Sequence, residues 1–207
     1  MIRTLSFLLA VLLIAAIAPA RDLPDPSCVL VSLDDTERLL MIPDPDGNAY
    51  ASFEVTVIDM WDCTTPIPNA LVEVIVGGAI DEKTGLCEGG ASTFGTTDEN
   101  GFVRMNVRGG GCLKGRPDAV VIRVDGVEIR HYGAVVSPDY AGADNEGIPG
   151  RFDLQIDPVD LAGFAAAYRG GTGGPSCHDY DNDGGTGPRD LAVFVSAYAG
   201  GATACDP

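Results

Sequence analysis

Short runs in which apolar and polar residues alternate dominate the chain up to about residue 136. In residues 51–59, Phe53 and Val55 would lie on one face of a strand and Glu54 and Thr56 on the other. Comparable runs predict strands at residues 28–33, 38–42, 51–59, 71–76, 91–97, 102–107, 119–124 and 127–132. Turn signals such as Asp125-Gly126 separate them. The pattern predicts a mostly β fold, with a β-sandwich over residues 21–136.

A second pattern, with helical spacing, begins near residue 153. Residues 153–171 repeat as residues 183–201, with a shared skeleton of Asp, Pro, Asp-Leu-Ala, Phe, Ala-Tyr and Gly-Gly. Each copy predicts a short helix with an apolar stripe. The stripes are Leu161, Phe164, Ala165 and Tyr168 in the first copy and Leu191, Phe194, Val195 and Tyr198 in the second. One such helix cannot bury its stripe alone, so we expect the two to pack antiparallel in a small α-helical module over residues 137–207.

Several segments of the predicted sandwich have a familiar order. They are the strand at residues 55–59, a Pro-Ile-x-Asn-Ala corner within residues 66–74 and a Thr-Asp-x-Asn-Gly hairpin at residues 97–102. This order resembles bacterial immunoglobulin-like and carboxypeptidase-regulatory-type sandwich modules. The resemblance implies an Ig-like β-sandwich and says little about function.

Residues 179–190 carry the spacing of an EF-hand calcium loop. Asp179, Asp181, Asp183 and Asp190 stand at loop positions 1, 3, 5 and 12, and a glycine stands at position 6. Gly185, at position 7, would contribute its backbone carbonyl. Position 12 is Asp rather than the usual Glu, so its shorter side chain pulls the following helix closer or gives up one oxygen. The spacing predicts calcium as the cofactor.

The duplicated loop-helix unit resembles the type I dockerin repeat, over residues 149–171 and 179–201. That resemblance implies calcium ligation by Asp179, Asp181, Asp183, the Gly185 carbonyl and Asp190, and a cohesin-like protein partner. Dockerins usually contact cohesin through small hydroxyl residues at loop positions 10 and 11. Here these positions hold Pro158-Val159 and Pro188-Arg189, which departs from the pattern for an ordinary cohesin.

The first copy of the loop is incomplete. With Asp160 at position 12, Asp153 falls at position 5 and Asp157 at position 9, whereas Leu154 replaces the glycine at position 6. Positions 1 and 3 hold no acid. Two alternatives remain open: this copy lacks a metal, with Asp153, Asp157 and Asp160 as remnants, or an insertion lets Asp139, Asp144 or Glu146 fold back as ligands.

The N-terminus and the charge indicate the compartment. A basic start, an apolar run at residues 5–18 and Ala18-Pro19-Ala20 predict a signal peptide over residues 1–20. The rest holds 12 Lys+Arg against 30 Asp+Glu, since Arg3 lies in the signal; its net charge is 12 − 30 = −18. This acidity argues against nucleic acid or an anionic membrane as partner. We expect a secreted or cell-surface protein with no membrane insertion after signal cleavage.

An even number of cysteines in an exported chain predicts disulfides. Cys177 and Cys205 bracket the calcium loop and its helix, which favours their pairing. The remaining pairs would then be Cys87–Cys112 and Cys28–Cys63.

No catalytic motif is present, so we expect a protein that is not an enzyme. The acid pairs at residues 34–35 and 81–82 are better read as solvated turns, His131 as a surface or packing residue, and Trp61 as a core or cap residue. The favoured function is calcium-dependent attachment to a protein partner, with the sandwich as spacer or binding surface. The alternatives are a carbohydrate-binding accessory of polysaccharide degradation and a cell-surface adhesin.

Overall fold

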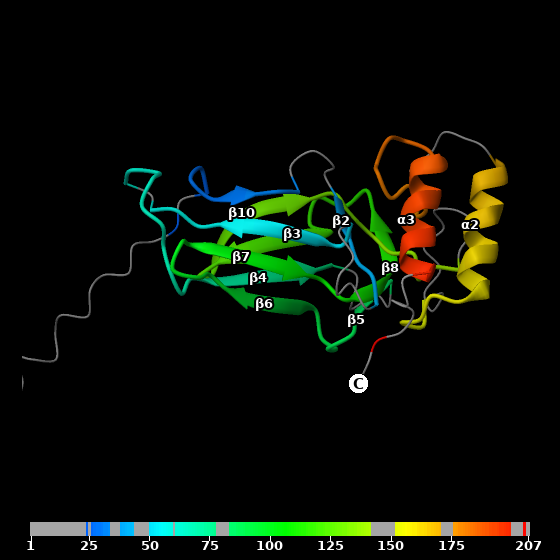
Figure 1. The fold of residues 1–207 in the computed structure, drawn as a ribbon, viewed down its shortest axis with the longest axis horizontal. Coiled ribbons are helices and arrows are strands. Elements are labelled where there is room, and N and C mark those ends of the chain that lie inside the picture. Colours follow the sequence, from blue (N-terminus) through cyan, green and yellow to red (C-terminus); the bar gives the residue numbers. More distant parts are fainter. Residues whose placement is uncertain are drawn as a thin grey trace, which may run out of the picture.

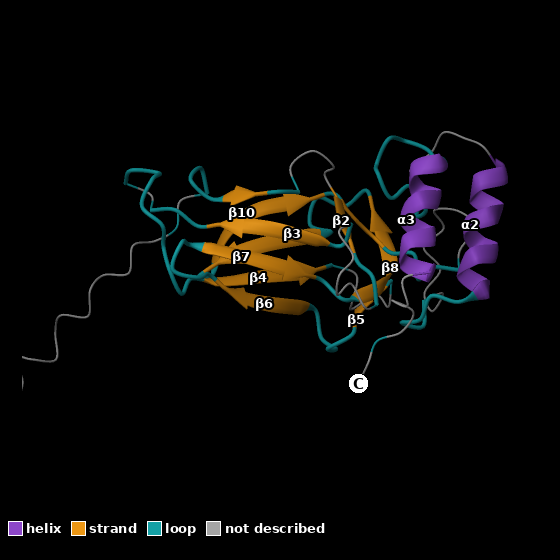
Figure 2. Cartoon of the chain, in the orientation of Figure 1, coloured by secondary structure: helices purple, strands orange, loops and turns teal. Residues whose placement is uncertain are grey.

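The computed structural model contains a long β-body with two helices at one end (Figures 1 and 2). It describes residues 24, 26–33, 38–43, 50–59, 61–77, 83–141, 152–170, 176–199 and 205. The predicted signal peptide, both acid pairs, Asp144 and Glu146 lie outside the described residues.

Two antiparallel sheets form most of the β-body. The first has the order β1-β3-β7, with strands Leu30–Val31, Ser52–Thr56 and Phe102–Asn106. The second has the order β10-β9-β4-β6, with strands Val127–Tyr132, Val120–Val124, Leu71–Val76 and Ser92–Thr96. Alternation places Phe53 and Val55 of one sheet and Val72, Val74 and Ile122 of the other in one shared core. The expectation of a mostly β fold is confirmed.

The turns show where the sequence signals were reliable. Asp125 and Gly126 both have positive φ, as a two-residue type I′ turn requires, and they join β9 to β10. The segment at residues 97–102 was predicted as a hairpin, and this is wrong. It connects β6 to β7, which belong to different sheets, so it carries the chain from one layer to the other.

A third sheet lies between these two sheets and the helices (Figure 1). Its order is β2-β11-β8-β5, with strands Arg38–Leu40, Ala134–Val136, Gly109–Lys114 and Thr84–Leu86; β11 runs parallel to β2. The sequence patterns do not predict β5, β8 or β11. In β8 the reason is its Gly109-Gly110-Gly111 start, because glycines contribute no apolar side chains to an alternating pattern.

The two helices are α2 (Pro158–Gly170) and α3 (Pro188–Ala199), each with proline in its first turn. They lie side by side, and the chain enters α2 and α3 at opposite ends of the pair, so they run antiparallel as expected (Figure 1). No helix within the described residues is long and apolar enough to cross a membrane.

The buried face of the helix pair is narrower than the predicted stripes. Phe164 and Phe194 are buried and their ring centroids lie 5.0 Å apart. The other buried positions are Asp160 and Asp190 in the first turns and three small or β-branched residues, Gly163, Val193 and Ala197. Five residues of the predicted stripes are instead exposed: Leu161, Tyr168, Leu191, Val195 and Tyr198.

A second core joins the helices to the third sheet. Leu40, Ile42 and Val136 of the β-body belong to one buried cluster with Phe164 and Phe194. Strand β11 ends at Val136, where the sequence boundary was placed, but hydrophobic packing continues across that position.

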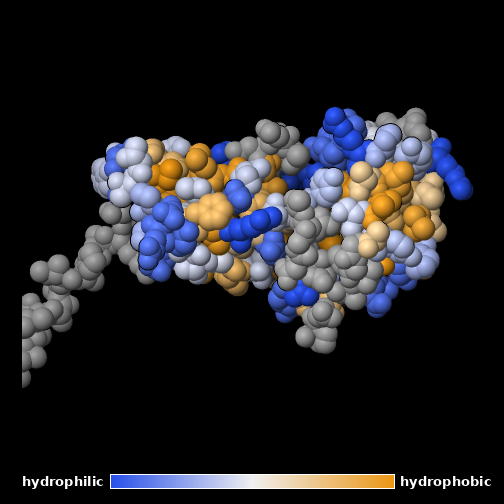
Figure 3. Space-filling model, viewed as in Figure 1, coloured by the Kyte–Doolittle hydropathy of each residue, from blue (hydrophilic) through white to orange (hydrophobic). Residues whose placement is uncertain are grey.

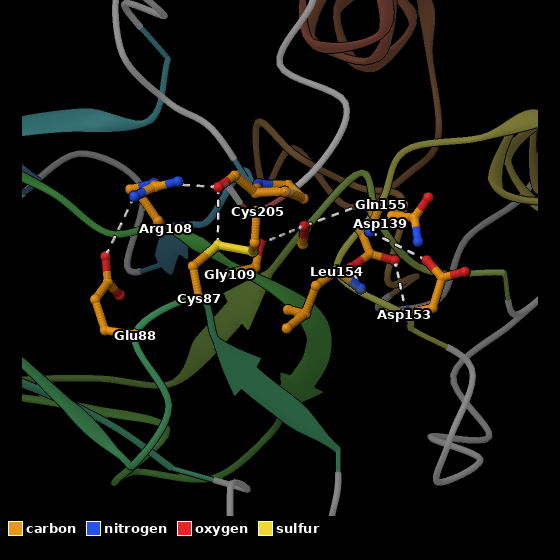
Figure 4. The surroundings of a disulfide bond; sticks show 11 residues. Cys87, Glu88, Arg108, Gly109, Asp139, Asp153, Leu154, Gln155 and Cys205 are labelled. Atoms are coloured by element: carbon orange, nitrogen blue, oxygen red, sulfur yellow. Dashed lines mark hydrogen bonds and ion pairs between the residues drawn. A yellow bond between two sulfur atoms is a disulfide. The ribbon is translucent and has the colours of Figure 1, made fainter. Parts of the chain in front are cut away.

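Two of the three disulfides also cross this boundary. The predicted Cys28–Cys63 bond is present, whereas Cys177–Cys205 and Cys87–Cys112 are wrong. The bonds are Cys87–Cys205, shown in Figure 4, and Cys112–Cys177. Each joins the β-body to the C-terminal part. The cause is packing: Cys112 on β8 lies in the core shared with the helices, and the Cys205 amide donates to the Leu154 carbonyl, 3.0 Å away.

Candidate metal centre

The loop before α3 is held at its start by the core. His178 and Tyr180 are fully buried, and both rings contact Phe164. Because these two residues point into the core, the alternate residues Asp179 and Asp181 turn toward the centre of the loop.

The loop gathers its four aspartates. One carboxylate oxygen each from Asp179, Asp181, Asp183 and Asp190 lies within 4.8 Å of the others. Asp179 and Asp190 are buried, Asp181 is half-buried and Asp183 is exposed. This increase in side-chain exposure from Asp179 and Asp190 to Asp183 is typical of a site that is open to solvent on one side. The first turn of α3 places Asp190.

Backbone amides fix the shape of this loop. Asp190 Oδ1 accepts from the amides of Tyr180 and Asp181, and Asp190 Oδ2 accepts from Gly187 N at 2.7 Å. Burial raises the pKa of Asp190, although these three amides oppose the shift. Gly184, at loop position 6, has φ +97°, a conformation that side chains rarely allow. The sharp turn expected there is present.

Two buried carboxylate oxygens point to a ligand. Among the described residues, Asp179 Oδ1 and Asp181 Oδ2 are buried atoms with no hydrogen-bond partner, and the Asp179 side chain is only 1% exposed. An unsatisfied buried carboxylate oxygen is costly. Calcium takes six to eight oxygen ligands from carboxylates, carbonyls and water. The residues therefore fit a hard divalent cation. The Gly185 amide donates to Asp183 at 3.1 Å, and its carbonyl as a ligand stays a prediction.

The predicted ligands of the first loop do not gather in the same way. In the part of the chain that the structure describes, Asp153, Asp157 and Asp160 form no cluster like that of the second loop. Their carboxylates instead bond to the local backbone: Asp160 Oδ2 accepts from Asp157 N at 2.8 Å and Asp153 Oδ1 from Gln155 N at 3.1 Å.

Asp139 folds back onto this loop, but its role as a metal ligand, one of the two sequence alternatives, stays a prediction. Its Oδ2 accepts from Leu154 N at 2.8 Å (Figure 4). In the second loop, Asp179 Oδ2 accepts from Gly184 N at 3.3 Å. Leu154 has φ +63°, so it copies the turn of Gly184 despite its side chain. Asp139 is thus the position-1 counterpart of Asp179, and the common Asp-Tyr dipeptides at residues 139–140 and 179–180 are the signal that marks it.

The carboxyl groups of the first loop favour protons. Burial raises the pKa of Asp139 to about 8, with the charge of Asp160 adding to the shift. Burial also raises the pKa of Asp160 to about 7. Burial therefore favours the protonated form of both acids, whereas the second loop has, within the described residues, two buried carboxylate oxygens without a hydrogen-bond partner.

The sequence patterns did not identify two cationic side chains that lie next to the second loop. Lys114 Nζ, at the end of β8, lies 3.3 Å from Asp179 Oδ2, and Arg38 on β2 is buried near the same carboxylates. No local motif links these residues to the loop, because they arrive from the third sheet.

The remaining candidates lie elsewhere. His131 is a surface residue, as expected, with Nε2 3.4 Å from Glu128 Oε2. The expectation that Trp61 is a core or cap residue is wrong, since it is 78% exposed.

Searches of protein-family models, of curated proteins and of solved structures found no match to this chain. The likeness to Ig-like and dockerin modules therefore rests on the sequence motifs alone and stays a prediction.

Proposed function

We propose that this chain is a secreted, non-catalytic calcium-binding protein whose C-terminal dockerin-like module attaches it to a protein partner. The Ig-like sandwich would serve as a spacer or binding surface. One observation carries the calcium assignment: Asp179 Oδ1 and Asp181 Oδ2 are buried without a donor at the centre of an EF-hand-spaced loop. Three disulfides support export to an oxidising compartment.

Calcium would stabilise the fold directly. Four carboxylates held together repel one another, and a cation that binds the folded chain alone adds its binding free energy to stability. At a calcium concentration ~100 times Kd the gain is about 2.7 kcal/mol.

Calorimetry and thermal melting test this part. We expect the purified chain from residue 21 onward to bind calcium and to melt at a lower temperature in EGTA. Asp179→Asn should weaken calcium binding by roughly tenfold or more, because ligand charge sets affinity in such loops. Asp118→Asn, an exposed aspartate of the β-body, is the matched control. A melting temperature unchanged by EGTA would contradict the proposal.

The attachment role draws support from the exposed apolar face of the helix pair (Figure 3). The exposed large apolar side chains of the two helices are Val159, Leu161, Tyr168, Leu191, Val195 and Tyr198. A contiguous exposed apolar face commonly marks a protein interaction site. Because the module shares a core and two disulfides with the sandwich, the bait for a pull-down should be the whole chain from residue 21.

The comparison that decides is between the unchanged bait and a Leu161→Ser/Leu191→Ser bait, both in calcium. We expect the double variant to lose partners that the unchanged bait captures. Leu71→Ser, an exposed leucine on β4, is the control and should retain them. Equal capture by all three baits would exclude this face.

A glycan-binding role for the sandwich is the second candidate. The observation that favours it is the exposure of Trp61, because aromatic rings at the surface can stack on sugars. A glycan array probed with the unchanged chain and with Trp61→Ala separates a glycan-binding role from a spacer role. Glycan binding that is lost in the variant supports a glycan site, and no binding by either chain leaves the spacer role.

A further inference from the structure

The third sheet presents two cations to the candidate calcium loop. Ala134 on β11 pairs with Arg38 on β2 at one side and with Lys114 on β8 at the other. Residues paired in this way project from the same face of a sheet, so Arg38 and Lys114 flank Ala134 in one row. The Cys112–Cys177 bond, two residues from Lys114, holds the loop against this row.

Lys114 contacts a predicted ligand directly. Its ammonium lies 3.3 Å from Asp179 Oδ2 and donates to the Ser176 carbonyl at 2.9 Å, and its side chain is only 9% exposed. The Gly184 amide donates to the same Oδ2. Two donors thus occupy Oδ2, which leaves Oδ1 as the oxygen that Asp179 can give to an ion.

Arg38 acts at longer range. It is buried, and burial lowers the pKa of its guanidinium, while the charges of Asp179, Asp181 and Asp190 oppose that shift. These three carboxylates all belong to the candidate site. A buried cation attracted to the same carboxylates as the ligand competes with it electrostatically.

The charges in this cluster sum to the opposite of one divalent ion. Four aspartates contribute −4, and Lys114 and Arg38 contribute +2, which leaves −4 + 2 = −2. Arg189 lies 4.0 Å from Asp181 Oδ2, but it is 85% exposed, so solvent screens its charge. One divalent cation neutralises the cluster, whereas a trivalent cation leaves a buried positive charge, which is costly.

We propose that Lys114 and Arg38 determine the charge selectivity of this site, tuning it to divalent rather than trivalent cations. This inference rests on the proposed calcium site. It assigns to the third sheet a part in cation recognition that the loop alone does not have.

The test measures the affinities of the chain from residue 21 for Ca²⁺ and for Tb³⁺ by calorimetry, in the unchanged protein and in Lys114→Met. Removing one positive charge should strengthen Tb³⁺ binding more than Ca²⁺ binding, because the repulsion it relieves scales with the charge of the ion. We expect the ratio of Tb³⁺ to Ca²⁺ affinity to rise about tenfold or more. A merely structural role for Lys114 would weaken both ions together and leave this ratio unchanged.

Controls distinguish failure of the calcium site itself from failure of the role proposed for Lys114 and Arg38. Lys83→Met, the same substitution at the other lysine of the chain, should leave the ratio unchanged, and Lys114→Arg should preserve it by keeping the charge. If Lys114→Met does not fold, Arg38→Gln also removes one positive charge and should likewise raise the ratio of Tb³⁺ to Ca²⁺ affinity. If the unchanged chain binds neither ion, the calcium site itself is wrong. If it binds calcium but no charge-removing variant shifts the ratio, only the role of Lys114 and Arg38 is overturned.

Discussion

The buried residue Asp139 forms hydrogen bonds both to the first loop and to β8. Its oxygens accept from the amides of Asp153 and Leu154, and its own carbonyl accepts from Gly111 N at 2.9 Å. A Cβ at position 110 would overlap Asp139 Oδ2, so a larger residue there would have to displace this carboxylate. Asp139 therefore joins β8 to the first loop by contacts that depend on the glycine at position 110.

The raised pKa of Asp139, about 8, predicts that stability falls as pH rises. Between the ordinary pKa of an aspartate and this raised value, the folded chain binds more protons than the unfolded chain, so the free energy of unfolding decreases with pH. We expect denaturant unfolding at saturating calcium to show higher stability at pH 5 than at pH 8.

Asp139→Asn should reduce this slope, since asparagine does not titrate. Part of the pH dependence should remain in this variant, because Asp160 also has a raised pKa, about 7. The exposed Asp118→Asn is the control and should keep the full slope. A slope equal in Asp139→Asn and in the unchanged chain would contradict the assignment.

At the scale of elements, the helix pair depends on two stacked phenylalanines. Phe164 also packs on Tyr180, with ring centroids 6.1 Å apart, so it links α2 to the candidate metal loop as well as to α3. The outward tyrosines Tyr168 and Tyr198 add a second stacked contact each but remain exposed.

Truncating an inward ring should cost far more than truncating an outward one. We expect Phe164→Ala to lower the free energy of unfolding by about 3–5 kcal/mol, through lost burial and the cavity left behind. Tyr198→Ala should cost about 1 kcal/mol or less, because its ring is already partly in water. Chemical denaturation in calcium measures both, and similar losses would show that the buried face has been assigned incorrectly.

The elements also show what the sequence could predict. Strands β4 and β10 match their predicted bounds, since alternating side chains and a strong turn signal mark them. The glycine-rich β8 left no such pattern. The buried helix face was misjudged because apolar spacing ignores small residues. A Cβ at Gly163 would lie 3.0 Å from the Ala141 backbone, so it is a glycine that lets α2 approach the chain there.

The four clustered aspartates of the second loop were foreseeable for a related reason. All four lie within one twelve-residue loop, so their arrangement depends on the local backbone and little on the rest of the fold. The partners of the site were not foreseeable, since Lys114 and Arg38 reach it through pairings across β11. The disulfide pairing failed on the same ground: closeness in sequence favoured Cys177–Cys205, and tertiary packing decided otherwise.

At the scale of the whole molecule, two disulfides and a shared core join the β-body to the C-terminal helical part. Cys112–Cys177 spans 65 residues and Cys87–Cys205 spans 118, and the core between them contains residues of both parts. The loop is therefore positioned by the third sheet, and its cation affinity should depend on contacts outside the module.

Removing individual disulfides tests this dependence. Cys112→Ala/Cys177→Ala should lower the free energy of unfolding by about 2–5 kcal/mol and also weaken calcium binding, because the loop loses its anchor beside Lys114. Cys28→Ala/Cys63→Ala, which opens a bond between residues of the predicted sandwich, should reduce stability but leave the calcium affinity of the folded chain unchanged. Calorimetry under conditions where both variants are folded makes the comparison. Equal calcium affinities in the two variants would show that the loop forms its site without the sandwich, as a freely linked module would.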